Sequence, residues 1–298
     1  MSDQHAPGSR STDRGRLLSA LALVVCLVAI EIVGGLLAGS LALLSDAGHM
    51  LTDAGAIGMS LLAIRLAAQP PSGGLTYGLK RAEILTALAN GIVLIAIALV
   101  ILDEAVHRLL APPAVAGGYV IVLSVVGAAV NLMATRRLGG AEPRSLNVEG
   151  SYQHLLTDMY AFIGTGLAGG VILVTGFTRA DPIASVFVAA LMTRAGLRLV
   201  RAALRVLVEA APEGVDVVEI GHAMASNPRV SNVHDLHVWE ITSGHPSLSA
   251  HVMVHPRDDC HSAQHELETL LHESFGIDHT TLQVDHAAVP DLVTVKDG

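Results

Sequence analysis

Charged residues are scarce in this sequence, and their scarcity excludes the largest class of proteins. Only 15% of the 298 residues are Asp, Glu, Lys or Arg, whereas 51% are hydrophobic, and the mean hydropathy is +0.54. This composition is too apolar for an ordinary soluble protein of the same length. Cysteine is nearly absent as well: Cys26 lies in an apolar run and Cys260 far from it, so no disulfide framework is expected. The sequence indicates an integral membrane protein.

The few charges are unevenly distributed along the chain. Before Glu209 there are 15 Lys and Arg against 12 Asp and Glu, and from Glu209 onward 3 against 15, so the net charge of -9 combines +3 with -12. The acidic part also carries 11 of the 15 histidines. Such a domain attracts metal cations and repels nucleic acid, although a solvated surface explains the same composition. We therefore expect a membrane part, a soluble tail and no nucleic-acid partner.

Six apolar segments are long enough to cross a lipid bilayer. They cover residues 17–38, 41–66, 83–109, 117–135, 147–175 and 182–200. The first segment leads into the second without a small-residue cleavage site, so we expect a retained helix rather than a signal peptide. Lys and Arg concentrate before the first segment, in every second connection and at the end of the sixth segment. The positive-inside rule therefore predicts that both termini are cytoplasmic.

The acidic part has the pattern of a small α+β domain. Helical and strand patterns follow one another in the ranges 215–227 (helix), 230–241 (strand), 248–254 (strand), 261–275 (helix) and 280–285 (strand). This order is typical of ferredoxin-like domains, in which helices cover one face of the sheet. The predicted organisation is a cytoplasmic tail (1–16), a six-helix transmembrane domain (17–208) and a cytoplasmic α+β domain (209–298).

Two pairs of ionisable residues interrupt the apolar segments, where charge is costly. His49 and Asp53 lie in the second segment, and His154 and Asp158 lie in the fifth. Each pair has i, i+4 spacing, so its two positions share one face of a helix. At ~1.5 Å per residue, both pairs lie about 15 Å from an end of their helix, near the membrane midplane. Two imidazoles and two carboxylates suit tetrahedral Zn²⁺ and balance its charge.

A single pair of this kind is explained equally well by a structural hydrogen bond between helices, and the repetition of the pattern favours a metal site. Glu31, Asp46 and Asn90 are further polar residues within apolar segments. They could line an ion path or bond to neighbouring helices, and the structural role is the more frequent one.

The stretch from Glu31 to Asp53 resembles the cation diffusion facilitators. Residues 77–85, the segment from His154 to Asp158 and the segment 233–239 (Val-His-Asp-Leu-His-Val-Trp) resemble the same family, so the resemblance extends from the first span to Asp285. It implies a homodimeric antiporter in the cell membrane that exports divalent metal ions from the cytoplasm in exchange for protons. The ligands of the transported ion would be His49, Asp53, His154 and Asp158.

The resemblance also concerns metal preference and the acidic domain. A His/Asp ligand set favours Zn²⁺, with Cd²⁺ or Co²⁺ as alternatives, and no organic cofactor is expected. A regulatory metal site in the metallochaperone-like cytoplasmic domain would use His234, His251, His261 and Asp285. Gln283 stands where some relatives have another histidine, so the number of bound ions stays open. Cys260 is expected to be incidental.

Two readings from other functional classes compete with transport. An intramembrane metalloenzyme would use zinc to activate water, but four protein ligands close the coordination shell and no spare buried carboxylate stands beside them as a base. A metal sensor would signal through the tail, but it would leave the paired intramembrane residues unexplained. Residues 136–145, between the fourth and fifth segments, also lack the histidine-rich insert of many eukaryotic members of the family that the chain resembles, so the resemblance implies a compact bacterial protein.

Overall fold

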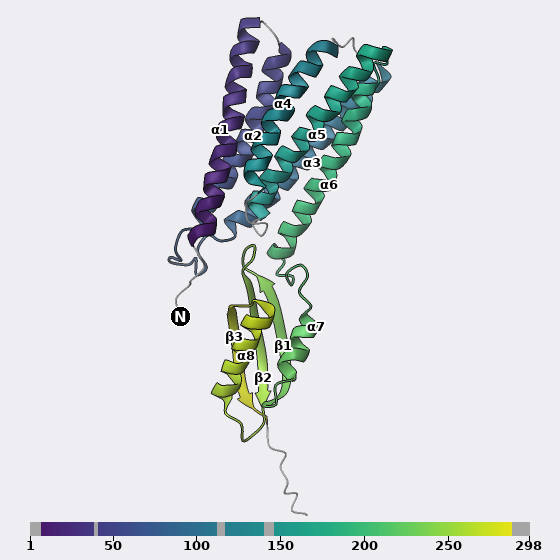
Figure 1. Ribbon diagram of the computed structural model, residues 1–298. Helices are drawn as coiled ribbons and strands as arrows, with labels where there is room; N and C mark the ends of the chain where they lie inside the picture. Colours follow the sequence, from purple (N-terminus) through teal and green to yellow (C-terminus); the bar gives the residue numbers. More distant parts are fainter. Residues whose placement is uncertain (1–6, 39–40, 112–116, 140–145, 288–298) are drawn as a thin grey trace, which may run out of the picture. The chain divides into compact units, whose positions relative to one another are not determined.

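The computed structural model describes residues 7–38, 41–111, 117–139 and 146–287, and the chain divides into two compact units, 1–204 and 205–298. Six long helices account for the described part of the first unit and run side by side as a bundle (Figure 1). They are α1 (Pro7–Ala38), α2 (Leu41–Ala67), α3 (Ala82–Leu110), α4 (Gly117–Leu138), α5 (Leu146–Thr175) and α6 (Ala180–Leu207). The helical membrane fold expected from the apolar segments is confirmed.

Two helices extend beyond the apolar segments that predicted them. α1 begins at Pro7, ten residues before the apolar run, and α6 ends at Leu207 rather than near Val200. Helical hydrogen bonds are local, so a helix continues into water when its residues allow it, whereas the apolar pattern marks only the part in hydrocarbon. Within the described residues, α3, α5 and α6 are long and apolar enough to cross a membrane.

The core of the bundle consists of two apolar clusters that share α5. The first joins α1, α2, α4 and α5, with Leu17, Ile57, Leu138 and Leu155 almost fully buried. The second joins α3 and α6 through residues such as Leu94 and packs against α5 through Ala161. Because α5 belongs to both clusters, its polar residues lie at the centre of the bundle.

α3 and α6 approach each other at two glycines. A Cβ atom on Gly91 would lie 2.9 Å from Val200 Cγ2 and 3.1 Å from the Gly196 carbonyl oxygen, and one on Gly196 would lie 2.8 Å from the Gly91 carbonyl oxygen. Small residues allow this distance between helix backbones in a membrane, where dispersion contacts replace the hydrophobic effect as the main source of association.

The second unit has a three-stranded sheet with helices on one face. Its elements are α7 (Val217–Ala225), β1 (Val230–Glu240), β2 (Pro246–Val254), α8 (Cys260–Phe275) and β3 (His279–His286). β2 is central, antiparallel to β1 and parallel to β3. Leu248, Ala250 and Val252 of β2 are buried against the helices, and the residues between them face the open side. The predicted α+β order is confirmed.

Both tail helices begin at an aspartate that caps them. The Asp216 carboxylate accepts hydrogen bonds from the backbone N–H groups of Val218 and Glu219, and Asp259 does the same for the start of α8. α8 then ends at Gly276, which adopts the left-handed conformation (φ 65°) that a residue with a side chain rarely takes. These local signals fix where the helices start and stop and so where the sheet face stays open.

We expect Gly196→Ala to destabilise the bundle, because the added methyl group would meet the backbone of α3. Overpacking of this kind costs about 1–3 kcal/mol. Gly170→Ala is the matched control on α5, since a Cβ there has no atom within 4 Å and gains helix propensity of up to about 1 kcal/mol. Thermal unfolding of the purified variants measures both. A Gly196 variant at least as stable as the Gly170 variant would contradict the close approach.

Candidate functional site

His154 and Asp158 lie one turn apart on α5, inside the bundle. The His154 residue is only 2% exposed and the Asp158 side chain 12%, and 3.9 Å separates Nε2 of His154 from Oδ2 of Asp158. Two nitrogen or oxygen ligands of a tetrahedral Zn²⁺, each about 2.0–2.1 Å from the ion, stand ~3.3 Å apart. The pair is therefore preorganised to within a small side-chain movement of a metal-binding geometry.

A buried polar network lies one turn from His154 and joins three helices. The hydroxyl groups of Ser60 (α2) and Ser151 (α5) are hydrogen-bonded at 2.8 Å. Asn147 of α5 donates its amide to the Ser60 carbonyl oxygen at 2.8 Å, and Asn90 of α3 donates to the Ser60 hydroxyl at 3.4 Å. All four residues are buried, so the contacts give partners to hydroxyl and amide N–H groups that would otherwise be costly in an apolar bundle, whereas Oδ1 of Asn90 and Oδ1 of Asn147 have none among the described residues.

The Ser60–Ser151 hydrogen bond fixes how α2 and α5 align along their axes. The helices run in opposite directions (Figure 1), and Asp53 precedes Ser60 by as many positions as Asp158 follows Ser151. Seven residues make nearly two full helical turns. Each aspartate position therefore lies on the same side of its helix as the serine and ~10 Å from it along the helix axis. The backbone positions 53 and 158 therefore lie at the same height along the bundle, on the sides of α2 and α5 that face each other.

The other predicted ligands of the transport site follow from the same register. Position 49 lies on the same side of α2 as position 53 and one turn further from Ser60. His154 lies on α5 one turn nearer to Ser151 than Asp158 does. The side chains of His49, Asp53, Glu31 and Asp46 lie outside the described residues. Of the two roles considered for Asn90, the structural one fits, because its amide donates a hydrogen bond to Ser60 of the neighbouring helix α2.

The open face of the tail sheet brings together several predicted ligands. His234 of β1 and His251 of β2 are cross-strand partners whose ring centroids are 5.4 Å apart. Gln283 of β3 is the partner of His251 on its other side, and its amide donates to Oδ2 of Asp285 at 2.9 Å. His234, His251 and Gln283 form one polar row across the sheet, on the face that the helices leave uncovered, and Asp285 lies beside the row, two residues along β3.

Sequence reasoning missed Asp235 and His237, which lie beside this row. Asp235 sits at an irregularity of β1 with φ 53°, which turns its carboxylate toward two histidines: His237 Nε2 is 2.9 Å from Oδ1, and His251 Nε2 is 3.9 Å from Oδ2. The hydrogen bond from His237 lowers the pKa of Asp235. The alternation of a regular strand would have placed Asp235 on the other face, and the sequence offers no turn signal there.

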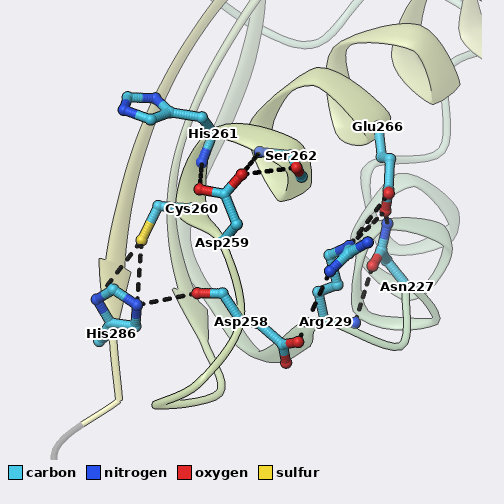
Figure 2. A network of polar contacts seen from close by, with 9 residues as sticks. All are labelled: Asn227, Arg229, Asp258, Asp259, Cys260, His261, Ser262, Glu266 and His286. Atoms are coloured by element: carbon cyan, nitrogen blue, oxygen red, sulfur yellow. Dashed lines mark hydrogen bonds and ion pairs between the residues drawn. The ribbon is translucent and has the colours of Figure 1, made fainter.

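His261 lies apart from this row, in the first turn of α8, which packs on the opposite face of the sheet. Figure 2 shows its backbone N–H donating to the Asp259 carboxylate, whose pKa the Ser262 and His261 hydrogen bonds lower. The neighbouring Cys260 Sγ lies 3.6 Å from Nδ1 of His286, and Nε2 of His286 donates to the Asp258 carbonyl oxygen at 3.0 Å. Within the described residues, no three His, Cys, Asp or Glu side chains form a group that could hold a metal ion.

Comparison with known proteins covers nearly the whole chain. A family model described as the cation efflux transmembrane domain matches residues 17–208, and one described as the cation efflux protein, cytoplasmic domain, matches residues 212–287. A cadmium, cobalt and zinc/H(+)-K(+) antiporter of Bacillus velezensis is 39% identical over 95% of this chain and 91% of its own length. The zinc transporter ZitB of Escherichia coli is 37% identical over 91% of this chain and 87% of its own.

One solved structure resembles a part of the chain. The metal-bound C-terminal domain of the CzcD transporter from Cuprividus metallidurans is 35% identical, covers 24% of this chain and 97% of its own, and superposes with a TM-score of 0.23.

The register of α2 and α5 predicts which positions can be cross-linked. In a chain with Cys26→Ser and Cys260→Ser, we expect Asp53→Cys with Asp158→Cys to react several times faster with a short bifunctional thiol reagent than His49→Cys with Asp158→Cys, which are offset by ~6 Å along the helix axes. Mass spectrometry of the linked peptides measures the yield.

The serine pair is tested in the same assay. Ser60→Val combined with Ser151→Val keeps the approximate volume but removes the hydrogen bond, so the preference for the 53/158 pair should fall. Equal yields from both cysteine pairs in the chain with native serines would contradict the alignment.

Proposed function

The chain belongs to the cation efflux family, the cation diffusion facilitators, and we propose that it exports divalent metal cations, Zn²⁺ first and Cd²⁺ or Co²⁺ as alternatives, in exchange for protons. It is a membrane transporter with a cytoplasmic C-terminal domain, so the metalloenzyme reading is set aside. The proposal includes a homodimer in the bacterial cell membrane with a cytoplasmic N-terminus, no organic cofactor and, given the acidic tail, no nucleic-acid partner.

The observation that carries the proposal is the buried His154–Asp158 pair at the level of position 53. We propose that His49, Asp53, His154 and Asp158 bind the transported ion between α2 and α5. The two carboxylates compensate the ion's charge in a low-dielectric interior, and the nitrogen and oxygen donors fit tetrahedral Zn²⁺ better than octahedral Mg²⁺. A metal sensor would not need such a pair inside the membrane.

The proposed cycle follows from competition between protons and metal at the histidines. Imidazole titrates near neutral pH, and a proton and a metal ion use the same lone pair. The site takes Zn²⁺ on the cytoplasmic side as the imidazoles lose protons. When the site opens to a more acidic exterior, protons displace the ion. The aspartates supply constant negative charge, and changes in helix packing around a fixed site alternate the access.

Transport tests the intramembrane site directly. In proteoliposomes with an imposed pH gradient, we expect Asp158→Asn or Asp53→Asn to reduce ⁶⁵Zn²⁺ flux by more than the ~10- to 100-fold typical of removing a group that only orients a metal ligand. Each substitution keeps the side-chain shape and removes the charge. Asp103→Asn is the control, because the Asp103 side chain is 76% exposed on α3 and should leave flux unchanged. Flux that is indifferent to both site variants would refute the proposal.

We also propose that the open face of the tail sheet binds Zn²⁺ as a regulatory ligand through His234, His251 and Asp285. These side chains do not form a three-ligand group in the described structure, so the proposal requires them to move together when the ion binds. His261, on the other side of the domain, is proposed as a ligand but is tested separately. Supporting the first group are the cross-strand contact of the two histidines and the adjacent carboxylates of Asp235 and Asp285.

Calorimetric titration of the full-length Asp158→Asn protein with Zn²⁺ isolates the tail sites. His251→Ala should remove at least one bound ion per chain, because it deletes the central residue of the row. His272→Ala is the control, since this exposed histidine pairs with Asp278 away from the row. An unchanged number of bound ions in the His251 variant would refute the open-face site. His261→Ala tests the remaining ligand: if this variant alone loses a bound ion, the tail site lies at α8 and not on the open face.

A further inference from the structure

A cavity between α5 and α6 has the opposite electrostatic character to the metal site. Its volume is about 140 Å³, and its polar lining consists of Gln153, Thr157 and Tyr160 of α5 with Arg194 and Arg198 of α6. No Asp or Glu is among the residues that line it. Glu149, one turn from Gln153 on α5, accepts a hydrogen bond from the Gln153 amide. A pathway for Zn²⁺ would not be lined by two cations, so the cavity suits an anion.

Among the described residues, the two arginines have no anionic partner. In the part of the chain that the structure describes, neither Arg194 nor Arg198 forms an ion pair or a hydrogen bond, whereas Arg108 at the other end of the bundle pairs with Glu104 and Asp181. Both lie in a helix that is long and apolar enough to span the membrane. An arginine in this setting is costly unless its guanidinium reaches water or a counter-ion.

The positions of the two arginines along α6 indicate which counter-ion they meet. Arg194 and Arg198 follow the start of α6 at Ala180 by 14 and 18 residues, or ~21 and ~27 Å along a membrane whose hydrocarbon core is about 30 Å thick. In the sequence α6 leads into the cytoplasmic domain, so the Arg198 guanidinium approaches the inner boundary of the hydrocarbon, and the long side chain of Arg194, one turn deeper in the membrane, can extend toward it. Lipid phosphates lie at this boundary, and their oxygens match the planar donor fork of arginine.

We propose that this cavity binds the phosphate group of an anionic phospholipid from the inner leaflet. Arg194 and Arg198 hold the phosphate, and Leu156, Leu191 and Tyr160 line the remaining wall. The lining also includes Thr157, which directly precedes Asp158, and Gln153, which directly precedes His154. A bound lipid would therefore contact the two turns of α5 that carry the ion-binding pair.

Native mass spectrometry of the full-length protein tests the site, with phosphatidylglycerol and phosphatidylcholine as the probes. The native chain should retain phosphatidylglycerol in preference to phosphatidylcholine. Because each cation near an anionic lipid contributes roughly a fivefold change in affinity, Arg194→Gln combined with Arg198→Gln should weaken phosphatidylglycerol binding about 30-fold. No zinc is present, so the outcome does not depend on transport.

Arg201→Gln is the matched control, because Arg201 is exposed on the same helix but does not line the cavity. Its lipid affinity should stay native, and thermal unfolding should show that all variants are folded. Arg194→Lys with Arg198→Lys keeps the charge but loses the fork, so intermediate retention is expected. Equal losses in the Arg201 variant and the double Gln variant would overturn the site in favour of general surface attraction.

Inorganic phosphate separates the two sources of the ligand. If phosphate at millimolar concentration does not displace phosphatidylglycerol, the lipid is the ligand, as proposed. If the chain retains both lipids equally and binds inorganic phosphate in a manner that requires Arg194 and Arg198, the site takes a free anion and the lipid proposal is wrong.

Discussion

A carboxylate inside an apolar helix bundle is the constraint on which the rest of this molecule depends. Moving an unpaired carboxylate out of water costs several kcal/mol even after the protein relaxes, so Asp158 requires a positive charge nearby. His154 lies 3.9 Å away on the same helix, but it carries charge only when protonated. At low proton concentration a metal cation can take that role, and the transport cycle that we propose uses the buried pair in this way to exchange one kind of cation for another.

Such exchange needs α2 and α5 to keep a fixed register while the bundle moves around them. The hydrogen bond between Ser60 and Ser151, with the contacts of Asn147 and Asn90, supplies the register at one level. Polar bonds suit this task in a membrane because apolar contacts between helices have little directional preference over contacts with lipid. α5 also packs closely on α6 and α3 at Gly150, where a Cβ atom would lie 3.0 Å from Leu199 Cδ2 and 3.5 Å from Asn90 Nδ2, so α5 is held by two different kinds of contact.

Regular periodicity made most of the fold predictable from sequence, whereas the features that depart from a regular period could not be predicted. The six apolar runs and the alternation of β2 are repeated signals, and the i, i+4 spacing of His154 and Asp158 placed them together on one helix face. Ser60 and Ser151 carry no comparable signal, because serine is common in membrane helices and its partner is set by tertiary packing. Asp235 was missed because a single residue with positive φ changes which face the following side chains take.

In our two proposals, the charges of the chain are sorted by the ion that each region binds. The buried aspartate and the acidic tail present oxygen and nitrogen donors to cations, whereas the unpaired arginines of α6 line a cavity without carboxylates. Placing cationic and anionic groups in one site would weaken the binding of either ion, because a guanidinium next to Asp158 would occupy the carboxylate that the metal needs. Gln153 and Thr157 separate them on α5. These neutral residues alternate with His154 and Asp158 around the helix, so the proposed anion-binding and cation-binding groups belong to different faces of one helix.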